Sequence, residues 1–192
     1  MEQFKDKYPD WFDEEGNYIP GSLENQIERT KDNIRTCNNA NLYGEESDFN
    51  LADLKLELEV LKGLQELDAA KKAKIIAIDS YDKSESVNSF TLDGEQVWLD
   101  KDTRVGLMNS TQIEKAAGRE TTTLWFGGRN YTIPCDTAIQ MLSALELYAL
   151  QCYNVTAQHK AAVEALSDVE AVEAYDYKTG YPDKLNLNTK TL

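Results

Sequence analysis

The chain has 192 residues, with 20 Lys and Arg against 34 Asp and Glu, and a formal net charge of −14. Binding to a phosphate backbone needs clustered Lys and Arg side chains, and no basic cluster stands out in this acidic sequence. We therefore expect neither nucleic acid nor an anionic membrane surface among its partners. The length suits one packed domain with appended elements.

Residues 1–21 combine aromatic side chains with turn-forming Gly and Pro. The run "WFDEEGNYI" fits a small hairpin around Gly16, and it equally fits an extended arm that docks its aromatic rings elsewhere. In both cases Trp11 and Phe12 are candidate partner-binding residues. The opening of the chain lacks the basic start and apolar core of a signal peptide. We therefore expect a protein that is not secreted by that route.

A short helix is predicted at residues 23–37, because apolar residues recur there on one face and Ser22 is a good N-cap. The following run, "NNANLYGEESDF" at 38–49, contains Asn, Gly and Ser and predicts a loop. We assign residues 1–50 a docking or adaptor role.

The longest predicted helix begins after Asn50 and runs to about Asp82. Its first half has the 3-4-3 spacing of a coiled-coil seam at Leu51, Leu54, Leu58 and Leu61, and a second stripe at Val60, Leu64 and Leu67. Two interpretations stay open for residues 51–83. Either the helix folds back on its own domain, or it brings copies of the chain together. The second makes Leu54, Leu58 and Leu61 partner-binding residues and predicts a homo-oligomer.

A short pattern then occurs twice. "FTLDGEQVWLDKDT" at 90–103 and "LWFGGRNYTIPCDT" at 124–137 align without a gap. Asp93-Gly94 and Gly127-Gly128 are strong two-residue hairpin signals. Period-two alternation places one set of apolar residues on a common face of each hairpin: Phe90, Leu92, Val97 and Leu99 in the first, and Leu124, Phe126, Tyr131 and Ile133 in the second.

A helical pattern follows each hairpin. The first starts at Asp102 and ends near Gly118, and the second runs from Asp136 to Leu166. An Asp at a helix start accepts hydrogen bonds from unpaired backbone N–H groups. The predicted fold is therefore α+β. Two ββα units in residues 84–174 form a small four-stranded antiparallel sheet with helices on one face, preceded by the long helix and the aromatic arm.

The alternation points Trp98 and Trp125 to the reverse side of that sheet. Either the long helix or the N-terminal arm covers them, or they mark a protein interface, where Trp is a favoured anchor. The tail at 175–192 contains Tyr175, Tyr177 and Tyr181. We expect it to pack on another part of the structure, and we include its tyrosines among the candidate partner-binding residues.

The sequence offers little for catalysis. Cys37, Cys135 and Cys152 form no close pair and are interpreted as reduced thiols. His159, the single histidine, lies in an alanine-rich helix with no acidic residue four positions away. We therefore predict no catalytic residues, no metal site and no cofactor.

The repeated region also resembles a known family. "VNSFTL", "WLDKDTRVGLMNS" and "IPCD" lie within an order of helix, hairpin, helix, hairpin and long alanine-rich helix. Residues 70–185 resemble in this way an uncharacterised domain of bacteriophage and prophage proteins. That domain is often carried at the C-terminal end of tail-fibre and tail-fibre-assembly proteins.

The resemblance implies a non-enzymatic structural or tail-fibre-assembly protein that acts by protein–protein interaction with other phage tail or fibre proteins. It would be found in the virion tail, or in the host cytoplasm during assembly. The alternative is a prophage-encoded intracellular module that binds a host protein. An enzyme ranks third.

Overall fold

The structure is a computed structural model that describes residues 21–47 and 49–189. The described chain divides into two compact units. An N-terminal unit holds the residues up to Lys72 together with Ser167–Val169, and a C-terminal unit holds Ala73–Leu166 together with the residues from Glu170 onward. The division falls within the helix α3 (Leu51–Asp82), which has the bounds that the sequence predicted.

The N-terminal unit begins with α2 (Leu23–Tyr43). Ser22 is its N-cap, as predicted, and its hydroxyl oxygen accepts from the Asn25 N–H at 3.3 Å. The predicted loop from residue 38 is wrong, because the helix continues to Tyr43. Ala and Asn are tolerated inside a helix, whereas Gly44 takes the left-handed conformation, with φ 71°, that ends one.

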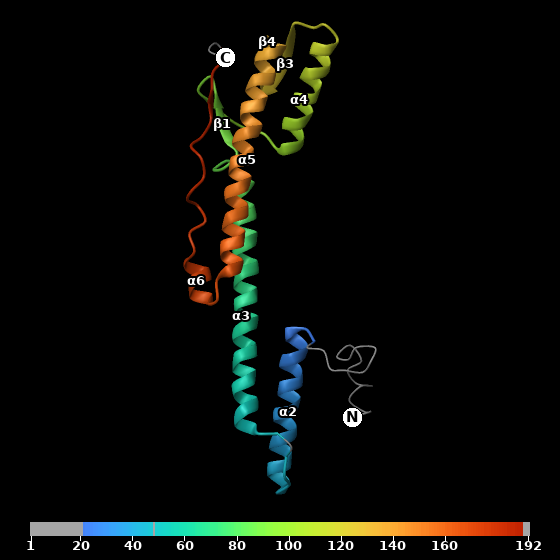
Figure 1. Cartoon of the computed structure of the whole chain (residues 1–192), viewed down its shortest axis with the longest axis vertical. Helices are drawn as coiled ribbons and strands as arrows, with labels where there is room; N and C mark the ends of the chain where they lie inside the picture. The colour runs from blue at the N-terminus through green and yellow to red at the C-terminus, as the bar shows by residue number, and fades with distance from the viewer. Residues whose placement is uncertain (1–20, 48, 190–192) are drawn as a thin grey trace. The chain divides into compact units, whose positions relative to one another are not determined.

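The second half of this unit is the first part of α3, which lies antiparallel to α2 (Figure 1). Asn50 caps α3 as predicted, since its side-chain oxygen accepts from the Ala52 N–H at 2.9 Å. Buried residues recur at spacings of three or seven residues, which keep them on one face of a helix, at Ile27, Thr30 and Cys37 on α2, and at Leu54 and Leu61 on α3. An ion pair of 3.7 Å joins Arg29 to Glu57. The two helices therefore form a hairpin with a coiled-coil type of seam.

The C-terminal unit contains both predicted hairpins. The first pairs β1 (Ser89–Leu92) with β2 (Glu95–Trp98), and the second pairs β3 (Thr121–Phe126) with β4 (Arg129–Pro134). Asp93 and Gly94 have φ of 50° and 87°, and Gly127 and Gly128 have 54° and 81°. Positive φ at both central residues defines the turn that matches the twist of hairpin strands. The tight bends are thus confirmed.

The single four-stranded sheet that we predicted does not form. The first hairpin belongs to a three-stranded sheet of order β2-β1-β5, and the second remains a separate two-stranded sheet. A strand from the tail, β5 (Asn186–Leu187), pairs parallel with the edge of β1 that β2 does not occupy. The hairpins meet through side chains instead, with the rings of Phe90 and Phe126 edge to face at 6.3 Å.

The N-termini of the two helices that follow the hairpins also differ from the prediction. For α4 (Lys101–Ala116) the N-cap is Asp100, and Asp102 lies in the first turn. For α5 (Cys135–Ala165) the N-cap is Pro134, which makes no side-chain hydrogen bond, and Asp136 lies in the first turn. A short α6 (Val169–Ala174) follows. Both Asp residues still face the positive end of a helix.

The core of this unit lies between the two hairpins and α5. The predicted inward faces are confirmed for Phe90, Leu92, Val97, Leu124, Phe126 and Ile133, which are buried, whereas Leu99 and Tyr131 are only partly buried. They pack with Met141, Leu142 and Leu145 of α5 in one hydrophobic cluster. The fold is therefore α+β, with long helices and small sheets.

The turn at Gly128 provides a first prediction. Ala at this position must adopt a left-handed conformation, which costs about 1–2 kcal/mol in an L-residue. Gly128→Ala should therefore lower the free energy of unfolding by about that amount. The matched control is Gly106→Ala in α4, where an added Cβ meets nothing within 4 Å and φ is not in the left-handed range. That change should stabilise the chain by about 0.5–1 kcal/mol. Urea unfolding followed by circular dichroism measures both, and equal effects would contradict the turn geometry.

Candidate functional site

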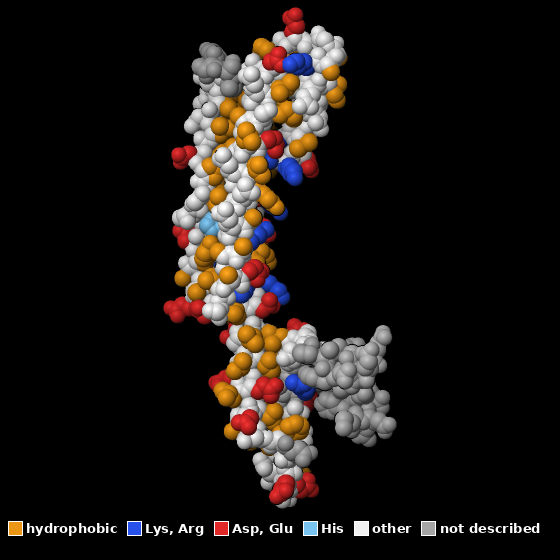
Figure 2. Space-filling view, viewed as in Figure 1, with side chains coloured by type: hydrophobic (Ala, Val, Ile, Leu, Met, Phe, Trp, Pro, Cys, Tyr) orange, Lys and Arg blue, Asp and Glu red, His pale blue; other side chains and the backbone are white. Residues whose placement is uncertain are grey.

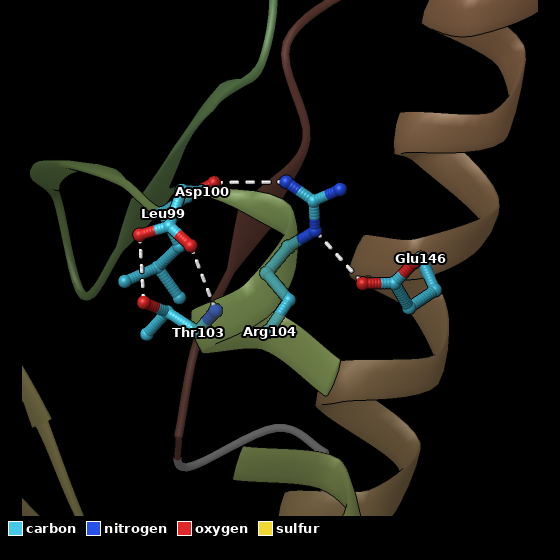
Figure 3. A network of polar contacts seen from close by, with 5 residues as sticks. All are labelled: Leu99, Asp100, Thr103, Arg104 and Glu146. Atoms are coloured by element: carbon cyan, nitrogen blue, oxygen red, sulfur yellow. Dashed lines mark hydrogen bonds and ion pairs between the residues drawn. The ribbon is translucent and has the colours of Figure 1, made fainter. Parts of the chain in front are cut away.

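One part-buried ionic contact fixes the first hairpin to α5 (Figure 3). Arg104 of α4 is only 7% exposed. Its Nε donates to a carboxylate oxygen of Glu146 on α5 at 2.8 Å, and its Nη1 donates to the carbonyl oxygen of Leu99 at 2.8 Å. One guanidinium thus connects the end of the hairpin, the start of α4 and the middle of α5. The N–H donors of this guanidinium thus bind groups of the same chain.

Asp100 completes this network at the start of α4. Its carboxylate accepts from the hydroxyl and the backbone N–H of Thr103, at 2.7 and 2.8 Å. The hydroxyl hydrogen bond, followed by the backbone one, lowers the pKa of the Asp100 carboxyl below its usual value. A lowered folded-state pKa means that the contribution to stability is present above the unfolded pKa and is lost as pH falls through the folded value.

A second polar cluster holds the tail. Tyr81 of α3 makes edge contacts with the rings of Tyr177 at 5.8 Å and Tyr181 at 5.6 Å. The Tyr181 hydroxyl lies 3.0 Å from the hydroxyl of Thr156, which donates to Asp82 at 2.8 Å. The expectation that the tail packs on the structure is therefore confirmed. Its tyrosines contact their own chain.

His159 belongs to this cluster. Its Nδ1 lies 2.8 Å from the Tyr175 hydroxyl, and its Nε2 lies 2.9 Å from the carbonyl oxygen of Thr179. Because a carbonyl oxygen only accepts, Nε2 carries the proton and Nδ1 accepts from the tyrosine. Both ring nitrogens are thus used to hold the tail. The sequence showed no partner for His159 because its partners lie 16 and 20 residues further along the chain.

The three cysteines lie apart, and each is a buried free thiol. Burial raises the pKa of the Cys152 thiol, which disfavours the reactive thiolate. Among residues 21–47 and 49–189, no group of three or more His, Cys, Asp or Glu side chains is arranged to hold a metal ion. In the same part of the chain, no helix combines the length and apolar character needed to cross a membrane.

Trp98 and Trp125 both point away from the core, as the alternation predicted, and both are exposed. They lie on different sheets, however, so they do not share one reverse face. Neither is fully covered by another element. Trp11 and Phe12 lie outside the described residues.

The outer face of α5 carries exposed apolar side chains. Leu147, Leu150 and Tyr153 are 63%, 53% and 64% exposed. Figure 2 shows hydrophobic side chains along the side of α5 that is turned to the viewer. Between residues 137 and 158 the only Asp, Glu, Lys or Arg is Glu146, which pairs with Arg104. We call the exposed, uncharged part of α5 at residues 147–158 the α5 face. Sequence reasoning assigned this helix to the core and missed its outer side.

In the N-terminal unit, Leu54 and Leu61 are each 7% exposed and Leu58 is half-buried. These seam residues lie in the hairpin of α2 and α3, so their exposure to a partner, which we expected, is not observed. The exposed apolar residues of this part of α3 are Leu56, Val60 and Leu64. A shallow groove beside them is lined by Ala52, Lys55, Leu56, Leu58, Glu59 and Lys62.

These arrangements have a common property. The polar clusters at Arg104 and His159 use their donors and acceptors inside the fold. The α5 face, by contrast, carries only apolar or uncharged side chains. Such a surface can bind another protein, because the centres of interfaces are depleted in charge and enriched in aromatic side chains.

Comparison with known families matches residues 69–179 to a family described as a domain of unknown function, DUF4376. The match spans more than half of the 192 residues, so the chain belongs to this family. No curated protein and no solved structure matches the chain.

The Arg104 contact gives a second prediction. Arg104→Met keeps an unbranched aliphatic side chain but leaves the Leu99 carbonyl without its donor and removes the contact to Glu146. Hydrogen bonds to charged groups contribute about 1.5–3 kcal/mol, and we expect the free energy of unfolding to fall by about 2–3 kcal/mol. The control is Arg129→Met, which removes an exposed ion pair to Glu95 of 3.3 Å and should change stability by at most about 0.5 kcal/mol. Urea unfolding compares the two, and similar losses would count against the assigned role.

Proposed function

We propose that this member of the DUF4376 family is a non-enzymatic binding protein that docks on another protein through the α5 face. We further propose that it serves as a structural or assembly protein of a bacteriophage tail, with other tail or fibre proteins as partners. The resemblance of residues 70–185 to a domain of phage tail-fibre proteins motivates the second part.

The observation that carries the proposal is the absence of charge on the α5 face. Charged residues make up 28% of the chain, yet residues 147–158 contain no Asp, Glu, Lys or Arg. Three exposed large apolar side chains lie in that run. An exposed helix that has no partner normally presents charged residues to water. The composition of this face therefore favours a protein partner.

The acidic charge of the rest of the chain supports the same proposal. A net charge of −14 opposes non-specific association of the chain. On such a protein, a neutral patch lets a partner bury apolar area without removing water from charged groups. Tight contacts are therefore expected at this patch. Trp125, which is 62% exposed, is an additional anchor on the second hairpin.

Copies of the chain are a further proposed partner. Because Leu54 and Leu61 are buried within the N-terminal unit, we propose that a second copy contacts the exposed residues Leu56, Val60 and Leu64 instead. Light scattering tests this part, and a monomer at high micromolar concentration would rule it out.

A third prediction concerns the α5 face. Leu147→Ser with Leu150→Ser should weaken binding to the cognate tail protein at least tenfold, because both side chains lose apolar contact area. The matched control is Leu56→Ser with Leu64→Ser, the same exchange at exposed leucines of α3. Its binding should stay within twofold of the unchanged chain. Purified tail proteins of the encoding phage, immobilised one at a time, provide the binding assay.

Both variants should keep their helical circular dichroism, since the four leucines are exposed. Equal binding of the two variants would contradict docking through the α5 face. Mass spectrometry of purified particles separates the two roles, because an assembly factor should be missing from the finished virion. Specific capture of a purified host protein, with no tail protein bound, would favour the prophage-encoded module instead.

A further inference from the structure

The tail behaves as a bound extended peptide. Between residues 176 and 189 it has no helix and a strand of only two residues, β5. Its path runs from α6 back along α5 to the edge of β1 (Figure 1). Leu187 is buried in the core cluster of the hairpins and α5, and Tyr181 and Leu185 pack against that cluster. The conformation of the tail is therefore set mainly by the surface that it covers.

The edge of β1 holds the tail by main-chain hydrogen bonds. The N–H of Thr91 donates to the Leu185 carbonyl at 2.9 Å, and the N–H of Asp93 donates to the Leu187 carbonyl at 3.0 Å. The Thr91 hydroxyl also donates to the side-chain oxygen of Asn186. This is the geometry by which a sheet edge accepts an added strand, with backbone bonds for affinity and a side-chain socket for specificity.

Asp93 adds a clamp at the end of the strand. Its carboxylate accepts from the backbone N–H of Thr189 at 2.9 Å and from the Thr189 hydroxyl at 2.7 Å. Asp93 is also the first turn residue of the hairpin, with φ 50°. The equivalent residue in the second hairpin is Gly127. The turn therefore does not require an Asp, and the carboxylate at this position contacts the tail.

The region matched to the family ends at residue 179. The residues that contact the β1 edge, from Leu185 to Thr189, all lie beyond it. The matched region therefore contains the acceptor edge, and the segment that follows supplies the strand.

We infer that the edge of β1 is a strand-acceptor site for an extended peptide with the pattern Leu-x-Leu-x-Thr, and that a second copy of this chain can supply that strand from its own tail. A second copy presents the identical residues, so every contact described above can form between chains as well as within one. This inference is independent of the proposed docking through the α5 face.

The test uses full-length chains and a labelled synthetic peptide of residues 180–189. Leu187→Asp places a charge in the apolar socket. The chain's own tail should therefore dissociate and expose the edge of β1. By fluorescence anisotropy, the peptide should bind this variant at least tenfold more tightly than the unchanged chain, whose attached tail competes at high effective concentration. The matched control is Lys184→Asp, which introduces the same side chain at an exposed tail position. In this variant the tail should still cover the edge of β1.

Two further changes test the contacts. A peptide that itself carries Leu187→Asp should not bind. Adding Asp93→Gly to the Leu187→Asp chain should weaken peptide binding at least threefold, while the Gly-Gly turn keeps the hairpin. If the Leu187→Asp chain keeps native circular dichroism and binds no peptide, the acceptor site is wrong.

Hydrogen exchange of the unchanged chain gives a second measurement that needs no variant. Successive amides of a strand point to opposite neighbours. Those of Thr91 and Asp93 face the tail, whereas those of Phe90 and Leu92 face β2. If the tail separates from the edge, the first pair should exchange at least tenfold faster than the second. Equal protection of the four amides would overturn a separable tail.

Light scattering tests the second copy as donor. The test uses the chain with Leu56→Ser and Leu64→Ser, which removes the self-contact proposed for α3. This chain should still form a dimer at high concentration, and the dimer should be lost when Leu187→Asp is added. A chain that stays monomeric at about 1 mM would overturn donation between copies.

Discussion

The C-terminal unit depends on one interaction, the burial of two apolar hairpin faces against α5. Neither hairpin is stable alone in water, because a two-stranded ribbon exposes as much apolar surface as it covers. Phe90 and Phe126 meet at the centre, and Leu142 and Leu145 of α5 belong to the same cluster. The repetition in the sequence follows from this requirement, since each copy contributes one half of a shared core.

Polar side chains of this unit then position the first hairpin and the tail. Arg104 fixes the first hairpin to α5, His159 holds the start of the tail, and Asp93 holds its end. Tyr148 donates to the Val87 carbonyl at 2.6 Å inside the core, and burial raises the pKa of its hydroxyl. Each of these groups joins segments that are far apart in the sequence. These polar side chains hold the segments of the unit together, whereas apolar side chains are exposed on the α5 face.

Much of the fold could be predicted from the sequence, because its signals are local. The turns at Asp93 and Gly127, the caps at Ser22 and Asn50 and the inward face of each hairpin depend on neighbours within a few residues. Apart from the end of α2 and the N-caps of α4 and α5, the errors concern distant pairing. The pattern of β1 does not reveal which strand joins its free edge, so the tail was missed as a third strand. The α5 face was missed for a similar reason, since an apolar run does not show which of its sides remains uncovered.

The pairing of β5 with β1 has a consequence for the order in which the structure forms. Thr91 and Asn186 are 95 residues apart, and the entropy lost on closing a loop grows with its length. The two hairpins and their helices are made of much more local contacts, which form first when folding follows contact order. The edge of β1 therefore exists before the tail of the same chain reaches it. During that interval the attached tail and the tail of another copy are chemically identical candidates. If a second copy donates its tail, as we inferred above, the concentration of chains decides which of the two tails completes the sheet.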